Sequence, residues 1–409
     1  MIQGYLQWAV LAIAVLGYAL LSGRLGKTPL SGSLVFLVAG WLLGPDVLGW
    51  LNIQVESENL RTITEFTLAL ILFTDAANAQ LSVLRDLRLP VRLLGLGLPL
   101  SIVLGALLAG LIFPAFTPLE ACLLGVCLAP TDAALGQPVV TNPRVPPRIR
   151  EDLSVESGLN DGICVPFLLF LLSLAAGQGA ANAGAAKAGM GQLGTFFVGE
   201  IGGGVLVGVA VCLLGCAARD ACSRRGWIAP DWRPVLAVAM AMVCFTLAQL
   251  IGGSGFIACF CGGLLFGGLT PRDKEEELVV AEGTGDVLSV TTWLIFGAAV
   301  FGRALEALTP ANLLYAVLSL TLVRMLPVAV ATLGLKLHRA TTLFVGWFGP
   351  RGLASIVFAV ILLDAGLPHG NALADVIAIT VTLSVLAHGL SAQGLAERYG
   401  RMVAARTPS

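Results

Sequence analysis

Long runs of apolar residues recur along this chain, separated by short polar stretches. A transmembrane α-helix needs about 17–25 mostly apolar residues, and shorter runs qualify where Gly or Pro interrupts them. The pattern therefore predicts an all-α, polytopic membrane protein with thirteen transmembrane segments, numbered 1–13 in chain order. Their approximate ranges are 6–22, 30–44, 60–79, 90–113, 119–140, 150–177, 191–217, 234–251, 254–269, 277–302, 311–335, 340–364 and 371–396.

Composition agrees with a membrane location. Of the 409 residues 57% are hydrophobic and 12% are charged, whereas a soluble domain is about 25% charged. The 49 glycines are common where membrane helices pack closely. A net charge of −1 does not indicate a nucleic-acid partner. The pair Cys259 and Cys261 lacks a second ligand pair, so we expect no metal or organic cofactor.

The basic residues predict the orientation. Of the 24 Lys and Arg residues, 19 lie in the C-terminal tail or in loops after odd-numbered segments, and only Arg61, Lys187 and Arg303 lie on the opposite side. Because cytoplasmic loops are enriched in Lys and Arg, the N-terminus is expected outside and the C-terminus in the cytoplasm. The expected location is the lipid bilayer of the cell (inner) membrane.

Segments 5 and 12 are predicted to be broken within the membrane. Segment 5 contains Ala129-Pro130-Thr131-Asp132, and segment 12 contains Gly349-Pro350-Arg351-Gly352. Pro removes a backbone donor and Gly relaxes the chain, so both segments should unwind. The breaks are seven segments apart and run in opposite directions, as in transporters built from inverted repeats. We expect one transmembrane domain without a soluble domain, with six-helix repeats over about 1–178 and 234–398 and a linker helix over about 190–218.

Segment 6 carries two carboxylates in Glu156-Ser157-Gly158-Leu159-Asn160-Asp161. An ionisable group at mid-membrane costs about 2.5 kcal/mol or more, so such groups are usually functional. Helical spacing places Ser157 with Asp161, whose oxygens can bind a small cation, and Glu156 with Asn160, whose amide it could orient. The alternative is a solvated helix end, because charged residues lie just upstream.

Three further charged residues inside predicted segments bear on the site. Asp132 lies in the segment 5 break, where a carboxylate and freed carbonyls suit a monovalent cation; alternatively it caps the restarting helix. Arg324 and Arg351 are expected to be buried, and a buried Arg needs a carboxylate or carbonyl partner. We expect Arg324 to pair with Glu156, and Arg351 to neutralise the helix ends of its own break.

These motifs together resemble the monovalent cation:proton antiporter family, in its electroneutral sodium/proton exchanger branch. The resemblance covers essentially the whole chain and follows the family order. The matching pieces are Pro130-Thr131-Asp132, Glu156-Ser157-Gly158-Leu159-Asn160-Asp161, Arg324 with Pro327, Gly349-Pro350-Arg351-Gly352 and Ala387-His388-Gly389-Leu390.

The resemblance implies a homodimer in which each chain has a scaffold half and a mobile half that carries the ion. It implies that Thr131, Asp132, Ser157 and Asp161 coordinate the cation. It also implies that Asn160 replaces one of two aspartates of the electrogenic branch, which suggests one-for-one exchange. The expected protein is an antiporter for pH homeostasis, not an enzyme, with Na⁺ favoured over K⁺ or Li⁺ as the cation exchanged for H⁺.

Two departures and two alternatives accompany this interpretation. The family often has Pro after the Asp of segment 5, where this chain has Ala133. In segment 3 the family usually has a Glu directly after Leu-Phe, where this chain has Thr74 followed by Asp75. Asp75 is thus a tentative site residue, or a helix-end residue.

Two alternative functions remain open to the sequence. A channel or symporter could use the same repeats. An intramembrane aspartyl protease using Asp286, in Gly283-Thr284-Gly285-Asp286, is disfavoured because no Tyr-Asp partner motif exists.

Overall fold

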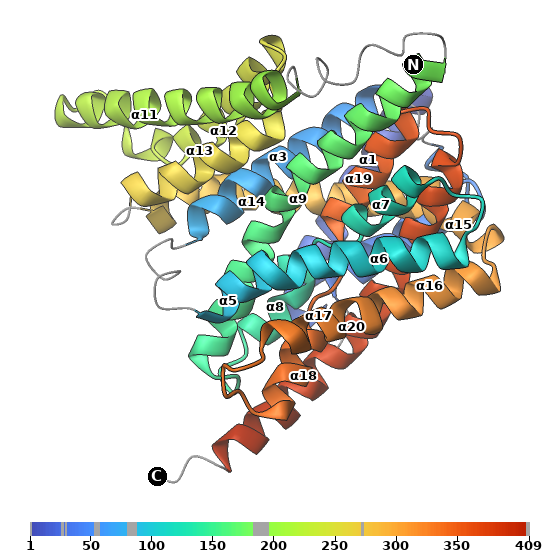
Figure 1. The fold of residues 1–409 in the computed structure, drawn as a ribbon. Coiled ribbons are helices and arrows are strands. Elements are labelled where there is room, and N and C mark those ends of the chain that lie inside the picture. The colour runs from blue at the N-terminus through green and yellow to red at the C-terminus, as the bar shows by residue number, and fades with distance from the viewer. Residues whose placement is uncertain are drawn as a thin grey trace. The chain divides into compact units, whose positions relative to one another are not determined.

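The computed structural model describes residues 2–25, 28, 31–52, 58–79, 88–182, 196–270 and 274–405, and the regular structure in these ranges is helical (Figure 1). Eight of the described helices are long and apolar enough to span a membrane. Four shorter apolar helices correspond to predicted segments 2, 5, 9 and 12, of which 5 and 12 are predicted to be broken: Gly32–Leu43, Pro118–Cys127, Gly255–Leu269 and Leu353–Asp364. The count of thirteen crossings stays a prediction.

The helices form two compact units, each built from separate stretches of the chain. Unit 1 contains Met1–Arg61, Leu87–Asn160 and Ser289–Ser409, and unit 2 contains Thr62–Asp86 and Asp161–Leu288. The long helix α9 (Pro147–Asn182) belongs to unit 1 up to Asn160 and to unit 2 from Asp161 onward. Helix α14 (Lys274–Phe296) is divided between the two units in the same way.

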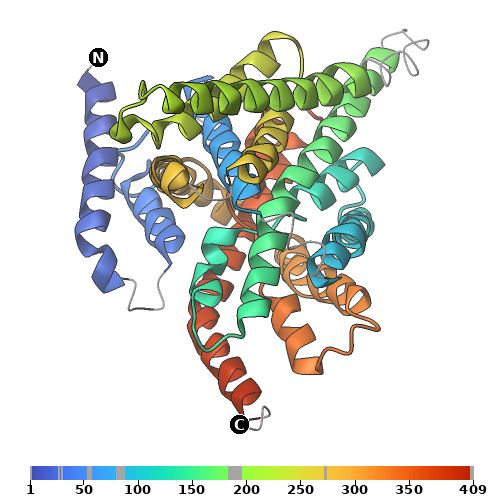
Figure 2. The ribbon, with the colours of Figure 1, turned by 90° about the vertical axis from the view of Figure 1, so that its left-hand side faces the viewer.

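Unit 1 contains the helices on either side of both breaks, α7 and α8 at the first and α18 and α19 at the second. Helices α1 and α2 lie side by side at the blue edge of Figure 2. The elements of unit 1 besides α9 and α14 are α1 (Ile2–Leu25), α2 (Gly32–Leu43), α5 (Arg88–Arg92), the π-helical turn η1 (Leu93–Gly97), α6 (Leu98–Ile112), α7 (Pro118–Cys127), α8 (Ala133–Val140), the π-helical turn η4 (Gly297–Phe301), α15 (Gly302–Glu306), α16 (Pro310–Leu320), α17 (Leu322–Ala331), α18 (Arg339–Trp347), α19 (Leu353–Asp364) and α20 (Gly370–Ala404).

Both predicted breaks are confirmed. Helix α7 ends at Cys127 and α8 begins at Ala133, because Pro130 has no N–H to continue the ladder. Helix α18 ends at Trp347 and α19 begins at Leu353, with Pro350 between them. Each break leaves the carbonyls of one half-helix and the N–H groups of the next without helical partners.

Buried apolar side chains from five helices fix one end of unit 1. They include Val139 on α8, Val328 on α17, Val345 on α18, Ala396 on α20 and Ile149 on α9. At the start of α7, the buried Glu120 accepts a hydrogen bond from the backbone N–H of His369 at 2.9 Å, which ties α7 to the start of α20. The half-helices are therefore held by contacts away from the breaks.

Unit 2 consists of a helix bundle with a buried ion-pair cluster. Helices α11 and α12 both pack on α13, as Figure 1 shows in green and yellow. Glu277, fully buried in the first turn of α14, pairs with Arg219 of α11 at 2.7 Å and with Arg233 at 3.2 Å. The remaining elements are α3 (Glu58–Asn78), the π-helical turn η2 (Phe196–Gly202), α11 (Gly203–Arg224), the 3₁₀ turn η3 (Pro230–Trp232), α12 (Val235–Leu250) and α13 (Gly255–Leu269).

Candidate ion-binding site

The two breaks meet inside unit 1. The backbone N–H of Asp132, in the break between α7 and α8, donates to the carbonyl of Pro350 in the break between α18 and α19, at 2.8 Å. A direct backbone hydrogen bond between two unwound segments requires the peptide chains themselves to touch. The broken helices therefore cross at their breaks.

Asp132 caps both half-helices that begin at this crossing. Its Oδ1 accepts from the N–H of Leu135 in α8 at 2.9 Å, and its Oδ2 accepts from the N–H of Leu353 in α19 at 2.8 Å. A carboxylate is favourable at helix N-termini, where unpaired N–H groups and the helix dipole are positive. A Cβ at Gly352 would collide with this carboxylate, so only Gly fits there. The helix-cap alternative is thus present in the structure, and ion binding by Asp132 stays a prediction.

Arg351 supplies the opposite charge at the crossing. Its fully buried guanidinium donates from Nη1 to the carbonyls of Ala129 at 2.6 Å and Pro130 at 3.1 Å, just past the end of α7. A cation beside unpaired carbonyls at a helix C-terminus is favourable. The expectation that Arg351 serves its own break needs correction, because this guanidinium binds the carbonyls of the other one. Its backbone N–H donates to Ser384 Oγ on α20 at 2.7 Å.

Thr131 is held by two side chains of α9. Asn160 accepts from the Thr131 backbone N–H through Oδ1 at 3.2 Å and donates through Nδ2 to Thr131 Oγ1 at 2.5 Å. Ser157 Oγ donates to the Thr131 carbonyl at 2.6 Å. The expected contact between the Asn160 amide and Glu156 is therefore wrong, since the amide hydrogen bonds found here go to Thr131. Asn160 is fully buried, and it fixes the unwound chain one residue before Asp132.

Glu156 instead binds Arg324 in a two-pronged ion pair. Arg324 Nη1 lies 2.7 Å from Glu156 Oε1, and Nη2 lies 2.8 Å from Oε2. Both side chains are buried, and a Cβ at Gly349 would collide with the guanidinium. The predicted pair is confirmed. It connects α9 with α17 and stands beside the second break.

Asp161 and Asp75 both belong to unit 2. Asp161 follows Asn160 on α9 and is 7% exposed, and Asp75 lies partly buried in α3. Their roles in cation binding stay predictions. Asp286 is exposed on α14, which does not fit the interior position that we would expect of a buried catalytic acid.

Two residues at the crossing were not singled out from the sequence as site residues. Ser384 accepts from Arg351, and His388, one helical turn further along α20, lies with Nε2 at 2.8 Å from the carbonyl of Trp347. The other ring nitrogen, Nδ1, lies 2.9 Å from the Ser384 carbonyl and 3.2 Å from Ser384 Oγ. His388 also lies in the Ala387-His388-Gly389-Leu390 motif, and its four-residue spacing from Ser384 was the signal for that second residue.

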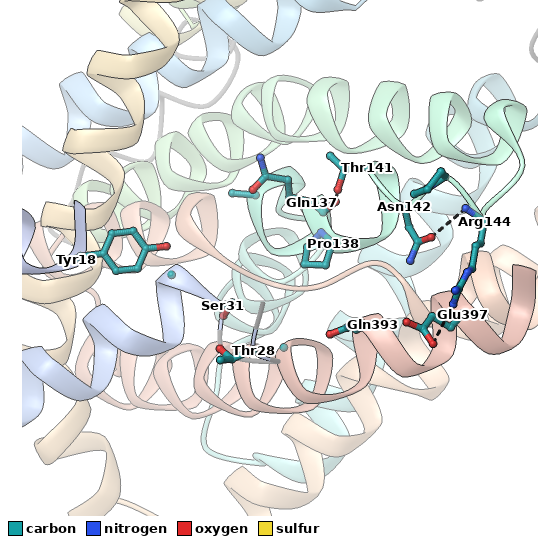
Figure 3. Close-up of a pocket in the computed structure, with 14 residues that line it drawn as sticks. Tyr18, Thr28, Ser31, Gln137, Pro138, Thr141, Asn142, Arg144, Gln393 and Glu397 are labelled. Atoms are coloured by element: carbon teal, nitrogen blue, oxygen red, sulfur yellow. Dashed lines mark hydrogen bonds and ion pairs between the residues drawn. The ribbon is translucent and has the colours of Figure 1, made fainter. Parts of the chain in front are cut away.

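A cavity of about 550 Å³ opens beside α8 and α20 (Figure 3). It begins at Ala134, two residues after Asp132, and its wall carries the polar side chains of Gln137, Thr141 and Gln393. At its edge Arg144 pairs with Glu397 at 3.2 Å. Polar lining of this kind suits water and small hydrated ions.

Comparison with known protein families decides the class to which this arrangement belongs. The family model described as "Sodium/hydrogen exchanger, transmembrane" matches residues 11–398. The chain belongs to the sodium/hydrogen exchanger family. It is therefore an integral membrane protein of a transporter family, and that family is not one of enzymes.

Two relatives and one solved structure show what this chain is similar to within the family. It is 25% identical over 383 residues to the K⁺/H⁺ antiporter NhaP2 of Shewanella oneidensis, covering 91% of this chain and 62% of that protein. It is 26% identical over 376 residues to the K⁺/H⁺ antiporter NhaP of Alkalimonas amylolytica, with the same coverage. The chain thus spans less than two thirds of the length of these relatives.

The fold is that of a solved antiporter. The structure of the sodium proton antiporter MjNhaP1 from Methanocaldococcus jannaschii at pH 8 superposes with a TM-score of 0.75. The match covers 94% of this chain and 98% of that chain at 22% sequence identity. At this identity the likeness establishes the fold, while the transported ion has to be argued from the site.

Proposed function

We propose that this chain is a secondary antiporter that exchanges a monovalent cation for H⁺ by alternating access across the cell inner membrane. The carrying observation is the crossing of the two breaks, where Thr131 and Asp132 are held by Asn160, Leu353 and Leu135. Unwound backbone at membrane depth is tolerated where it serves a site or a cavity, as in transporters.

The chemistry of exchange follows from the oxygens at this point. Hydroxyl and carbonyl oxygens keep a lone pair after making one hydrogen bond, so Thr131 and Ser157 can still ligate a hard cation. We assign the cation to Thr131, Asp132, Ser157 and Asp161. Asp161 is the proposed shared group: its carboxylate binds either a proton or the cation, and this competition couples their movements in opposite directions.

Access to the proposed site is supported by the cavity of Figure 3. Its lining includes the Arg144–Glu397 pair and also Ala134 in the first turn of α8, the helix that Asp132 caps. The excess of Lys and Arg assigns this side to the cytoplasm, with the N-terminus outside and the C-terminus inside. We propose that the ion enters from the cytoplasm through this cavity.

Cation identity, stoichiometry and assembly are further parts of the proposal. We favour Na⁺, while K⁺ and Li⁺ offer the same hard-ion chemistry and two relatives carry K⁺/H⁺ in their names. Because Asn160 is neutral, Asp161 alone would cycle between proton and cation, which gives electroneutral one-for-one exchange. A homodimer of chains with inverted six-helix repeats completes the proposed architecture.

Exchange by the purified full chain in liposomes tests the function. Vesicles with an acidic lumen and a pH-sensitive dye should show alkalinisation of the lumen when Na⁺, Li⁺ or K⁺ is added outside. A channel would pass the cation without moving protons, and a symporter would carry protons inward with it. Either result would exclude antiport, and empty vesicles give the leak rate.

A further inference from the structure

A second cavity, separate from the proposed ion site, lies among α17, α18 and α20. Its volume is about 480 Å³, within the range of roughly 300–1,000 Å³ typical of small-molecule sites. Phe344, Trp347, Phe348, Leu395 and Met402 form apolar walls. Leu343 and Leu395 are exposed at its opening, so the cavity is open to its surroundings.

Basic side chains lie at one edge of this cavity. Arg398 contributes to its lining, and Lys336 and Arg339 line an adjoining cavity that shares Leu343 with it. All three basic residues are exposed. Among the ion pairs of the described residues none involves them, whereas Arg324 and Arg219 elsewhere in the chain have carboxylate partners. Their charge is therefore available to an anion from outside the chain.

An apolar cavity beside unpaired cations matches one constituent of the membrane. A neutral lipid would fill the apolar part and leave the basic edge unused, and a free phosphate would do the reverse. An anionic phospholipid satisfies both, because Arg binds phosphate with two parallel hydrogen bonds and each Lys or Arg near an anionic membrane surface contributes about 1 kcal/mol. Lys336, Arg339 and Arg398 also lie on the side that the distribution of basic residues predicts to be cytoplasmic.

We propose that this cavity binds an anionic phospholipid, with an acyl chain along Phe344 and Trp347 and the phosphate at Arg398. The lipid would contact the last turn of α18, directly before the second break. That turn is fixed to α20, since Trp347 Nε1 donates to Ser391 Oγ at 3.0 Å and the Trp347 carbonyl accepts from His388. Lipid binding should therefore stabilise the packing of α18 on α20. The inference rests on the membrane location alone and does not depend on antiport.

Native mass spectrometry of the delipidated full chain, with added phosphatidylglycerol or phosphatidylcholine, tests the proposal. Wild type should retain phosphatidylglycerol at least fivefold better than phosphatidylcholine, and the melting temperature should rise only with the anionic lipid. Arg398→Gln combined with Arg339→Gln should remove the preference. For the single variant Arg398→Gln, which should weaken the preference, the matched control is Arg401→Gln. It removes the same single charge three residues further along α20, at a residue that does not line the cavity, and should behave as wild type.

Three results would overturn the proposal. Equal retention of both lipids would mean a general hydrophobic surface. Equal losses in Arg401→Gln and Arg398→Gln would mean a diffuse charge effect. A melting shift reproduced by inorganic phosphate would mean an anion site without a lipid chain.

A second measurement does not depend on the Arg variants folding. Brominated acyl chains quench nearby tryptophans, so the quenching lost in Trp347→Phe reports lipid at this cavity. Brominated phosphatidylglycerol should quench Trp347 at concentrations where brominated phosphatidylcholine does not. Identical quenching in wild type and Trp347→Phe would place the lipid elsewhere.

Discussion

Asp132 and Leu353 are 221 residues apart in the chain and joined by a 2.8 Å hydrogen bond from the Leu353 N–H to the Asp132 carboxylate. One broken helix thus caps the restart of the other. The Asp132 carboxylate lies at the N-termini of two helices, and the Arg351 guanidinium binds the Ala129 carbonyl at the C-terminus of a third. Each charge is placed where the helix dipole favours it. Removal of either charge should disturb both half-helix pairs.

Replacement of Asp132 by Asn separates its two roles. Asn is as good an N-cap as Asp, so helix α8 should keep its cap, with a stability loss of about 0.5–2 kcal/mol from the weakened second contact. If the carboxylate also binds the cation, transport should fall more than tenfold and apparent cation affinity should weaken. Liposome exchange and thermal melting measure the two effects. Wild-type cation affinity in this variant would leave Asp132 as a cap only.

The Gly352→Ala substitution tests the close approach of the two breaks. Its Cβ would collide with the Asp132 carboxylate and force the crossing apart, at about 1–3 kcal/mol. We expect lower melting temperature and more than tenfold slower exchange. Gly346→Ala is the matched control, because its nearest neighbour would be Met325 Cα at an ordinary 3.5 Å. Similar behaviour of the two variants would contradict the crowded crossing.

The Glu156–Arg324 pair should be strongly coupled in a double-mutant cycle. Replacement of either residue by Ala strands a buried charge, which costs about 3–5 kcal/mol, and the double variant should recover part of that loss. The exposed pair Arg61–Asp364 is the control, for which about 1 kcal/mol or less is expected. Additive losses at Glu156 and Arg324, measured by thermal or denaturant unfolding, would show that their contact contributes nothing.

Asp161→Asn should abolish exchange and leave the folded protein intact. The amide cannot alternate between proton and cation, while its size is nearly unchanged. Liposome exchange and size-exclusion chromatography are the measurements. Asp286→Asn, at an exposed position on α14, should retain wild-type exchange. Substantial transport by Asp161→Asn would exclude it as the shared site.

Exchange should be insensitive to membrane potential. One charge moved across 100 mV corresponds to about 2.3 kcal/mol, so an uneven stoichiometry would shift the end-point of transport strongly. Liposomes clamped with potassium and valinomycin, with Na⁺ as substrate, provide the measurement. A rate or end-point that follows the imposed potential would indicate a second titrating acid, with Asp75 and Asp132 as the first candidates.

Much of the helical framework follows from the sequence. The helical segments and both breaks depend on local properties: the length of an apolar run, the missing N–H of Pro and the freedom of Gly. The Glu156–Arg324 pair could also be anticipated, because a charge buried in an apolar segment must find a partner and few were available. The carboxylates of segment 6 were recognisable for the same energetic reason.

The partners at the crossing were decided by the tertiary structure alone. A hydrogen bond requires atoms within about 3 Å, whereas apolar patterns locate a segment only to within several residues. The binding of Arg351 to Ala129 and Pro130, of Asn160 to Thr131, and of Ser384 to Arg351 depends on how two breaks far apart in the sequence meet. The sequence determines that buried charges and unwound carbonyls must be satisfied, and the packing of the helices determines which group satisfies which.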